Sequence, residues 1–406
     1  MRHDFDRIVD RRNTLSLKWD HCEQCFGIED VIPMWVADMD FEAPPAVAEA
    51  LRSRAAHPIY GYASTPDSFW QAAIDWLDRR HGWKVERKWL ARSPGVVPAL
   101  SLCVNAFTEP GDGVVVQPPV YYPFFWAVEN NGRRLVRNPL VARADGRYVM
   151  DLAGLEPKLD ERTRLLILCS PHNPVGRVWT AAELEALGEV CERRDLLVLA
   201  DEIHMDLVLR RHRHVPFASL SEKLAARTIT CIAPSKTFNV AGLATSLVVA
   251  SNPKLLSRYE RQLRASGLGI GSLFGNVGLE AAYRHGAEWL DDLLEYLEGN
   301  VNLAERFLAE KVPMLRFVRP EGTYLALIDC RALGMDQRAL DDFFLRSARV
   351  YFDSGSMFGR ETEGFERINL ACPRATLLEA LERMAKAIES LRARPGDPST
   401  PASGRG

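Results

Sequence analysis

The sequence predicts an α/β domain with a mostly parallel central sheet, joined to a smaller α+β domain. Short apolar runs recur through the middle of the chain, and each has the length of a buried strand. Stretches with helical spacing of apolar residues separate several of these runs, an alternation that is typical of parallel sheets. After residue 291 the order changes, because a long helical pattern precedes two strand-like runs and two further helices.

Five apolar runs are the expected strands of the central sheet. After the second run, Thr180 precedes Glu183 at the spacing of a capping box, which predicts a helix over residues 180–194. Another helix is expected at Val96–Phe107. Ligands bind beyond the carboxyl ends of strands in such sheets, so the residues after each run are candidates for a site. The runs are Val114–Val116, Leu165–Cys169, Leu196–Ala200, Thr228–Ile232 and Ser246–Ala250.

We expect four parts along the chain. Residues 1–45 are punctuated by proline and are expected to associate with the smaller domain, or else to form an arm onto a partner subunit. Residues 46–290 form the larger domain, residues 291–393 the smaller domain, and residues 394–406 a disordered tail rich in Pro, Ser and Gly. The elements expected in the smaller domain are helices at Leu290–Lys311, Gln337–Ala348 and Ala375–Ala393 and strands at Leu315–Val318 and Tyr324–Cys330.

The composition narrows the class of protein. With 406 residues, a net charge of -3, 47% hydrophobic and 26% charged residues, the chain is typical of soluble globular proteins. This charge balance argues against nucleic acid or an anionic membrane as the main partner. No apolar run reaches the ~18 residues of a transmembrane helix. The first residues lack an apolar signal segment, so the expected location is the cytoplasm.

The cysteines do not indicate a disulfide framework, since eight in a chain of this length are too few. Cys22 and Cys25 form a CxxC pair, but no second pair accompanies them at the spacing of a zinc site. We therefore expect reduced thiols and no metal.

Three polar residues follow successive expected strands. Lys236 comes just after a strand and a turn, where partial desolvation would lower its pKa and favour Schiff-base chemistry. Asp201 directly follows a strand, and a buried carboxylate there needs a partner such as a pyridinium nitrogen. Asn173 lies in the tight turn PHNPVG. Singly, these residues could be a loop lysine, a helix cap and a turn, but together they indicate one site.

The segments around these residues resemble enzymes of the class I and II aminotransferase family, which have the pyridoxal 5'-phosphate (PLP) fold type I of aspartate aminotransferase. More narrowly, the chain resembles the MalY/PatB-type branch of cystathionine β-lyases, or C–S lyases. Nine motifs occur in the family's order from residue 18 to residue 374. They are KWD at 18–20, MWVADMDF at 34–41, YGY at 60–62, PGVVPAL at 94–100, QPPVYYPF at 117–124, LCSPHNPVGRVWT at 168–180, DEIHMD at 201–206, PSKTFNVAGL at 234–243 and RINLACPR at 367–374.

The resemblance implies PLP as cofactor and a role for each residue that faces its ring. Lys236 is implied to hold PLP as a Schiff base and then to remove the Cα proton of the substrate. Asp201 is implied to pair with the ring nitrogen and Asn173 to donate to the ring oxygen. Tyr121 is implied to stack on the ring at the catalytic centre. His204 occupies the position where the wider family has a tyrosine, three residues after the aspartate.

The resemblance also implies how the phosphate is bound. The backbone N–H groups of Gly95 and Val96 would face it at the start of the expected helix. Ser235 would add a hydroxyl. Tyr62, rather than Tyr60, would reach the phosphate and the substrate from a second subunit, which implies a homodimer with shared active sites.

Two further features concern the substrate and the phosphate charge. Arg374 is implied to grip the α-carboxylate of an amino-acid substrate, because a guanidinium fork matches a carboxylate. The backbone near Ala37 is implied to line the same pocket. Many relatives carry an arginine eight residues after the Schiff-base lysine, on the phosphate, whereas this chain has Ala244 there.

The expected function is therefore β-elimination of cysteine S-conjugates such as L-cystathionine, which releases a thiol, pyruvate and ammonia. Two alternatives stay open. An aminotransferase would share the early steps but would require a keto acid. A regulator could retain PLP and act by binding a protein partner. The thiol side of the substrate is not indicated by the sequence.

Overall fold

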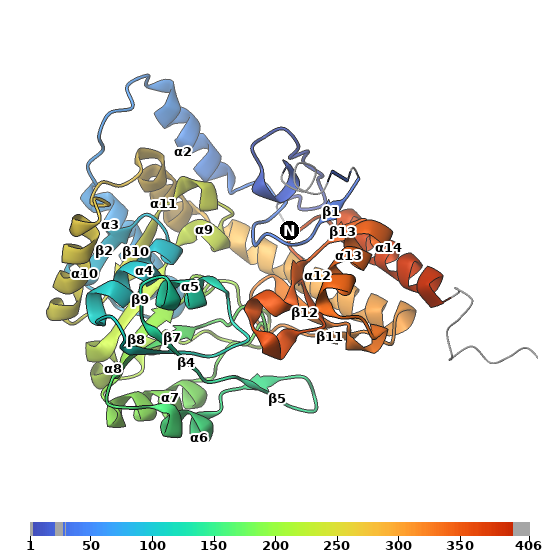
Figure 1. Cartoon of the computed structure of the whole chain (residues 1–406). Coiled ribbons are helices and arrows are strands. Elements are labelled where there is room, and N and C mark those ends of the chain that lie inside the picture. Colours follow the sequence, from blue (N-terminus) through green and yellow to red (C-terminus); the bar gives the residue numbers. More distant parts are fainter. Residues whose placement is uncertain (1–2, 21–26, 29, 393–406) are drawn as a thin grey trace, which may run out of the picture.

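The computed structural model describes residues 3–20, 27–28 and 30–392 (Figure 1). The expectations for Cys22, Cys25 and the tail at 394–406 lie outside the described residues. Among the described helices, none combines the length and apolar character that crossing a bilayer requires.

A seven-stranded sheet forms the centre of the larger part of the molecule, with the strand order β2-β10-β9-β8-β7-β3-β4. All strands run in one direction except β10, which is antiparallel to both of its neighbours. The expectation of a mostly parallel sheet is confirmed. The strands are β2 (Leu90–Ser93), β3 (Gly113–Val116), β4 (Arg134–Arg137), β7 (Thr163–Cys169), β8 (Leu197–Asp201), β9 (Thr228–Ile232) and β10 (Ser246–Val249).

Helices cover both faces of this sheet, which explains the continuous apolar runs. Along β7, Leu165 and Ile167 pack on the face that α4 and α10 cover, whereas Leu166 and Leu168 pack on the face of α7. Thr180 caps α7 with the expected capping box. The helices here are α2 (Pro45–Ala56), α3 (Asp67–His81), α4 (Val96–Phe107), α5 (Pro123–Glu129), α6 (Leu152–Leu155), α7 (Ala181–Arg193), α8 (Glu222–Arg227), α9 (Pro234–Thr237), α10 (Pro253–Ala265) and α11 (Leu273–His285).

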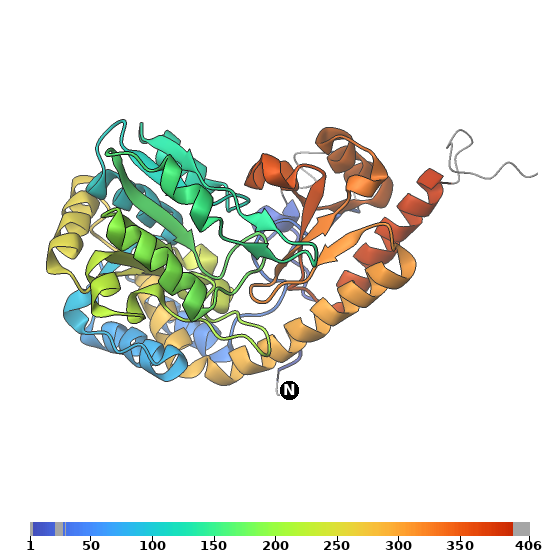
Figure 2. The same cartoon turned by 90° about the horizontal axis from the view of Figure 1, so that it is seen from below.

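A four-stranded antiparallel sheet, β11-β12-β15-β14, forms the centre of the smaller part. The long helix α12 runs from the larger part along the smaller one (Figure 2). The strands are β11 (Arg316–Val318), β12 (Leu325–Asp329), β14 (Asp353–Ser354) and β15 (Phe365–Asn369), and the helices are α12 (Ala287–Lys311), α13 (Gln337–Phe343), which continues as a π-helical turn at Phe344–Ala348, and α14 (Arg374–Arg392).

The N-terminal segment lies against the smaller part. Its strand β1 (Ile32–Pro33) pairs in parallel with β13 (Val350–Tyr351). Further along, the Asp40 N–H donates to the carbonyl of Ala371 at 2.9 Å, just before α14. The segment therefore stays in contact with the smaller part as far as Asp40, shortly before α2 begins. A small two-stranded sheet of β5 (Val141–Ala142) and β6 (Tyr148–Val149) completes the described sheets.

Candidate active site

A cavity of about 240 Å³ lies at the carboxyl ends of the central strands. Parallel strands bring the residues that follow them to one edge of a sheet, so residues far apart in sequence meet there. Of the residues named from the sequence, those that line the cavity are Ala37, Gly95, Val96, Tyr121, Asn173, Asp201, His204, Ser235, Lys236 and Ala244.

Lys236 lies in the short helix α9, directly after β9. Its Nζ donates to the carbonyl oxygen of Ala37 at 2.7 Å. Burial lowers the pKa of Lys236 to about 8, with Asp38 and Asp201 raising it and Arg367 lowering it further. About a tenth of this amine is therefore neutral, and hence nucleophilic, at pH 7.

Asp201 ends β8, and its side chain is buried. Burial raises the pKa of Asp201 to about 7, partly offset by the Ile203 N–H, which donates to Oδ1 at 3.1 Å, and by Lys236. Turns rather than a helix follow Asp201, so it does not cap a helix. A ligand cation against this carboxylate would be favourable, because it would replace lost solvation.

Arg367 is a buried arginine that bonds the cavity residue Asn173, and sequence reasoning did not select it. It lies on β15 and its Nη1 donates to Asn173 Oδ1 at 3.2 Å. Its Nη2 donates to the Trp35 carbonyl at 2.6 Å and pairs with Asp353 at 2.5 Å. The Phe358 ring lies 4.8 Å from its guanidinium carbon. Within the described residues Nε has no hydrogen-bond partner, so this cation retains a donor.

Arg374, which was expected to grip a substrate carboxylate, is not among the described residues that line the cavity. Arg374 begins α14, with its guanidinium carbon 4.2 Å from the Tyr296 ring centroid and Nη1 3.9 Å from an Asp6 oxygen. The chain leaves β15 after Asn369 and turns before the helix, which carries Arg374 away from the cavity. Both arginines belong to the RINLACPR motif, and the available signal was that Arg367 lies inside an apolar run, where a buried charge requires a partner.

The start of α4 also lines the cavity. Gly95 is the N-cap residue and no side chain caps the helix, so the first N–H groups of α4 are available to an anion. Ser235 and Thr245 line the cavity as well. Ala244 has the positive φ of 49° and contributes no charge. Among the cavity-lining residues that the structure describes, Lys236 is the one lysine or arginine.

Tyr121 and His204 also line the cavity, and Tyr324 contacts two of the lining residues, Ala37 and His204. Burial lowers the pKa of His204 to about 3, so its ring is neutral, and it meets Tyr324 edge-on with ring centroids 6.0 Å apart. The Tyr324 hydroxyl donates to the carbonyl of Ala37 at 2.8 Å, and sequence reasoning did not find this residue. Burial raises the pKa of Tyr121 above its ordinary value, so its hydroxyl stays protonated.

Tyr62 and Tyr60 do not line the cavity of their own chain. Tyr62 is 93% exposed and Tyr60 is 58% exposed, both on the segment between α2 and α3. The Tyr60 hydroxyl donates to the Ala55 carbonyl at 2.7 Å. Their expected role concerns a second subunit and stays a prediction.

The fold and the cavity define an α/β protein with a half-buried lysine and a buried carboxylate at the carboxyl ends of its strands. The chain belongs to the aminotransferase class I and II family, whose model matches residues 29–384. The fold class and the family expected from the sequence are confirmed.

Three similar proteins refine the comparison. The cystathionine β-lyase PatB of Bacillus subtilis is 45% identical over 385 residues, which are 95% of this chain and 99% of PatB. The PLP-bound putative aminotransferase from Clostridium difficile has a TM-score of 0.93 at 44% identity, covering 95% of this chain and all of that structure. Cystalysin from Treponema denticola, which contains PLP, has a TM-score of 0.93 at 37% identity, covering 96% of this chain and 100% of cystalysin.

Proposed function

We propose that this protein is a PLP-dependent C–S lyase that cleaves cysteine S-conjugates such as L-cystathionine. The likeness to PatB over nearly the whole of both chains supports the reaction. The observation that carries the proposal is that Lys236, with a pKa of about 8, and the buried Asp201 line one cavity.

The residues of the cavity fit PLP. Asp201 is a buried carboxylate that lacks a cationic hydrogen-bond partner among the described residues, which suits a protonated ring nitrogen. Because Asn173 Oδ1 accepts from Arg367, its Nδ2 is the group that can donate to the ring oxygen. The start of α4 and Ser235 suit the phosphate. When bound, PLP supplies an electron-accepting ring that stabilises negative charge at the Cα of an amino acid.

The chain's own residues then bind the substrate and move protons. Arg367 is the buried guanidinium that can hold the α-carboxylate through its remaining donor, Nε. Lys236 Nζ takes the proton from Cα when neutral. The Cβ–S bond breaks as its electron pair leaves with sulfur, and the thiolate takes up a proton. The remaining three-carbon fragment reacts with water and leaves as pyruvate and ammonium.

We also propose a homodimer in which Tyr62 of each chain reaches the phosphate in the other chain's site. The support is that Tyr62 is 93% exposed on a segment where Ile59 and Tyr60 are exposed as well. Neighbouring exposed apolar side chains of this kind mark a surface that contacts another protein. A cytoplasmic location is proposed because the described cysteines are free and buried, as expected in a reducing compartment.

The test is the keto-acid dependence of turnover. PLP-loaded protein is incubated with L-cystathionine, with and without 2-oxoglutarate. A lyase releases pyruvate and homocysteine at the same rate in both reactions. Turnover that requires 2-oxoglutarate and releases no thiol would identify an aminotransferase instead. No turnover of several S-conjugates in either condition would favour a regulatory protein.

A further inference from the structure

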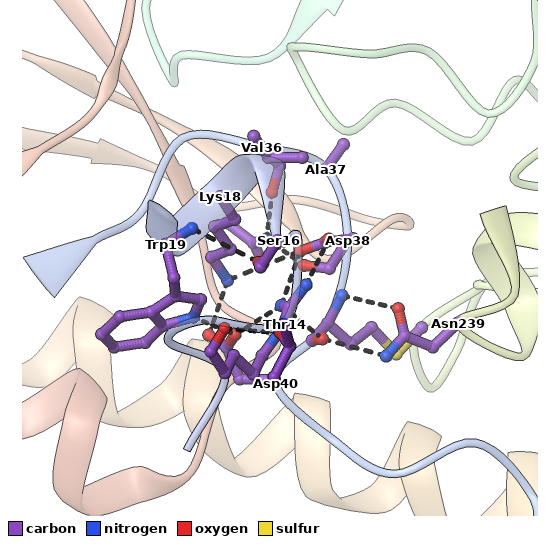
Figure 3. A network of polar contacts seen from close by, with 12 residues as sticks. Thr14, Ser16, Lys18, Trp19, Val36, Ala37, Asp38, Asp40 and Asn239 are labelled. Carbon is purple, nitrogen blue, oxygen red and sulfur yellow. Dashed lines mark hydrogen bonds and ion pairs between the residues drawn. The ribbon is translucent and has the colours of Figure 1, made fainter. Parts of the chain in front are cut away.

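Two cations of the N-terminal segment hold two carboxylates that follow β1 (Figure 3). Lys18 is 0% exposed, and its Nζ lies 2.6 Å from Asp40 Oδ2 and 4.0 Å from Asp38 Oδ1. Arg11 bonds both oxygens of Asp38, at 2.9 and 2.7 Å, and Asp40 Oδ1 at 2.7 Å. Trp19 Nε1 donates to Asp40 Oδ1 at 2.8 Å. The group contains two positive and two negative charges, so its charge is balanced.

These carboxylates belong to a segment, Trp35–Phe41, that we call the active-site strap. Side chains from four distant parts of the chain bond its backbone, so the strap is fixed even though it has no strand partner of its own. These bonds are Arg367 to the Trp35 carbonyl, Asn369 to the Val36 and Asp38 carbonyls, Lys236 and Tyr324 to the Ala37 carbonyl, Arg11 to the Met39 carbonyl, and Asn239 to the Met39 and Phe41 carbonyls.

Asn239 links the strap to the loop of the reactive lysine. It lies three residues after Lys236, and its Oδ1 also accepts the Met39 N–H at 3.0 Å. The strap is therefore bonded to Asn239 of the Lys236 loop and, through Asp38 and Asp40, to Arg11 and Lys18. Figure 3 shows Asn239 on one side of the strap and Lys18 on the other. A displacement of the strap would move the Ala37 carbonyl oxygen, which accepts the hydrogen bond from Lys236 Nζ.

The buried ion pair itself is weak evidence for stability. The free energy lost when two charges are removed from water is about as large as the free energy gained from their attraction. Replacing such a pair by apolar residues therefore often leaves the stability of the protein unchanged. A buried pair does specify geometry, because each charge must keep its partner. Burial alone raises the pKa of Asp40, but Lys18 and hydrogen bonds from Lys18 and Trp19 hold that pKa below its ordinary value.

We propose that the Lys18–Asp40 ion pair is a positioning device that fixes the strap, so that the Ala37 carbonyl and the Asp38 carboxylate face Lys236. This inference rests on the proposed function, in which Lys236 is the reacting amine. The charged and titratable groups around Lys236 are Asp38 on the strap, Asp201 at the end of β8, His204 just after it, Arg367 on β15 and Tyr324 before β12. Asp38 is the one of these that Lys18 and Arg11 hold directly.

The test uses the PLP-loaded Lys18→Met and Asp40→Asn variants. In Lys18→Met the thioether fills the lysine stem's space, and Asp40 keeps Arg11 and Trp19 as partners, so we expect a folded protein. The control is Arg383→Met, which removes an arginine 23% exposed that pairs with Asp30 and Glu379 away from the cavity. The readouts are kcat/KM, Tm, and the pH midpoint at which the visible absorption of bound PLP changes.

We expect both variants to bind PLP and to lose roughly tenfold or more in kcat/KM, because a misplacement of about 1 Å is enough for such a loss. The absorption midpoint should move to lower pH by about half a unit, since a loosened Asp38 favours the protonated nitrogen less. Arg383→Met should change neither value. A fall in Tm with unchanged midpoint and kcat/KM in both variants would overturn the inference. Wild-type protein that binds no PLP would instead contradict the proposed function.

Discussion

Arg367 and Asn173 are hydrogen-bonded beside the cavity, with Nη1 3.2 Å from Oδ1, although 194 residues separate them in the chain. Asn173 follows β7 of the large sheet, whereas Arg367 lies on β15 of the small one. One bond therefore joins the group proposed to face the cofactor ring to the group proposed to bind the substrate. It also makes the relative position of the two sheets part of the active site.

Arg367 and Arg374 provide a direct comparison within one motif. Arg367→Ala should lower kcat/KM roughly a hundredfold, because it removes a buried guanidinium and leaves Asp353 unpaired. Arg374→Ala should lower kcat/KM by less than about threefold, because that side chain is 40% exposed and contacts Tyr296 and Asp6. Steady-state kinetics on both variants, with Tm as the control for folding, show which of the two arginines binds the substrate carboxylate. Equal losses would contradict the assignment.

The lowered pKa of Lys236 predicts how fast cofactor-free protein takes up PLP. Only the neutral amine reacts, so the rate should rise with pH and level off above about 8, where Lys236 is deprotonated. An ordinary lysine, with a pKa of about 10.4, would give a rate that still rises tenfold per pH unit at pH 9. Stopped-flow absorbance between pH 6 and 9.5 distinguishes these results, with Lys236→Ala as the blank.

Asp201 should make the cofactor-free protein less stable as the pH rises. Burial raises its folded-state pKa to about 7, above the unfolded value of about 3.9, so the folded protein holds an extra proton between these values. Stability from this group is therefore present below pH 4 and lost as the pH rises towards 7. Asp201→Asn removes this contribution.

The measurement is the Tm of both cofactor-free proteins at pH 5 and pH 7.5. Wild type should lose more Tm across this interval than Asp201→Asn does, since all other titrating groups are shared. Adding PLP at pH 7.5 should raise the Tm of the wild type above that of Asp201→Asn, because the ring nitrogen of PLP would pair with the carboxylate, which only the wild type has. Equal pH slopes would show that the carboxylate is not destabilised by burial.

The proposed sharing of sites predicts complementation between two inactive variants. Lys236→Ala and Tyr62→Ala should each have low activity, and co-refolding them should restore turnover. A hybrid dimer contains one site with both native residues, and a random mixture contains about half hybrids, so roughly a quarter of wild-type activity should return. The control mixes each variant with itself. Mixtures no more active than their parents would argue against a phosphate contact from the second chain.

Much of the fold could be predicted from the sequence, because strands covered on both faces leave continuous apolar runs. β9 begins and ends at the expected residues, as does α4. The antiparallel direction of β10 could not be predicted, since a strand buried on both faces has the same apolar sequence pattern whether it runs parallel or antiparallel to its neighbours. The edge strands β2 and β4 were not expected, because Arg92 and Arg134 interrupt their apolar character.

The site could be predicted for residues at the carboxyl end of a strand, because the local sequence shows where each strand ends. Asn173, Asp201 and Lys236 lie at or just after the ends of the consecutive strands β7, β8 and β9, and the structure brings all three to one cavity. Contacts between segments that are far apart in the chain leave no pattern in the local sequence. The choice of Arg367 depends on where β15 ends, and the contact between Tyr324 and Ala37 joins residues 287 positions apart.

The central claim is that Lys236 serves a β-elimination in this cavity. The most direct measurement is the stoichiometry of products from L-cystathionine with purified, PLP-loaded protein and no added keto acid. We expect pyruvate, ammonium and homocysteine in equal amounts, with no product from Lys236→Ala that has been loaded with PLP. Pyruvate formation that survives in Lys236→Ala, or thiol release without pyruvate, would contradict it.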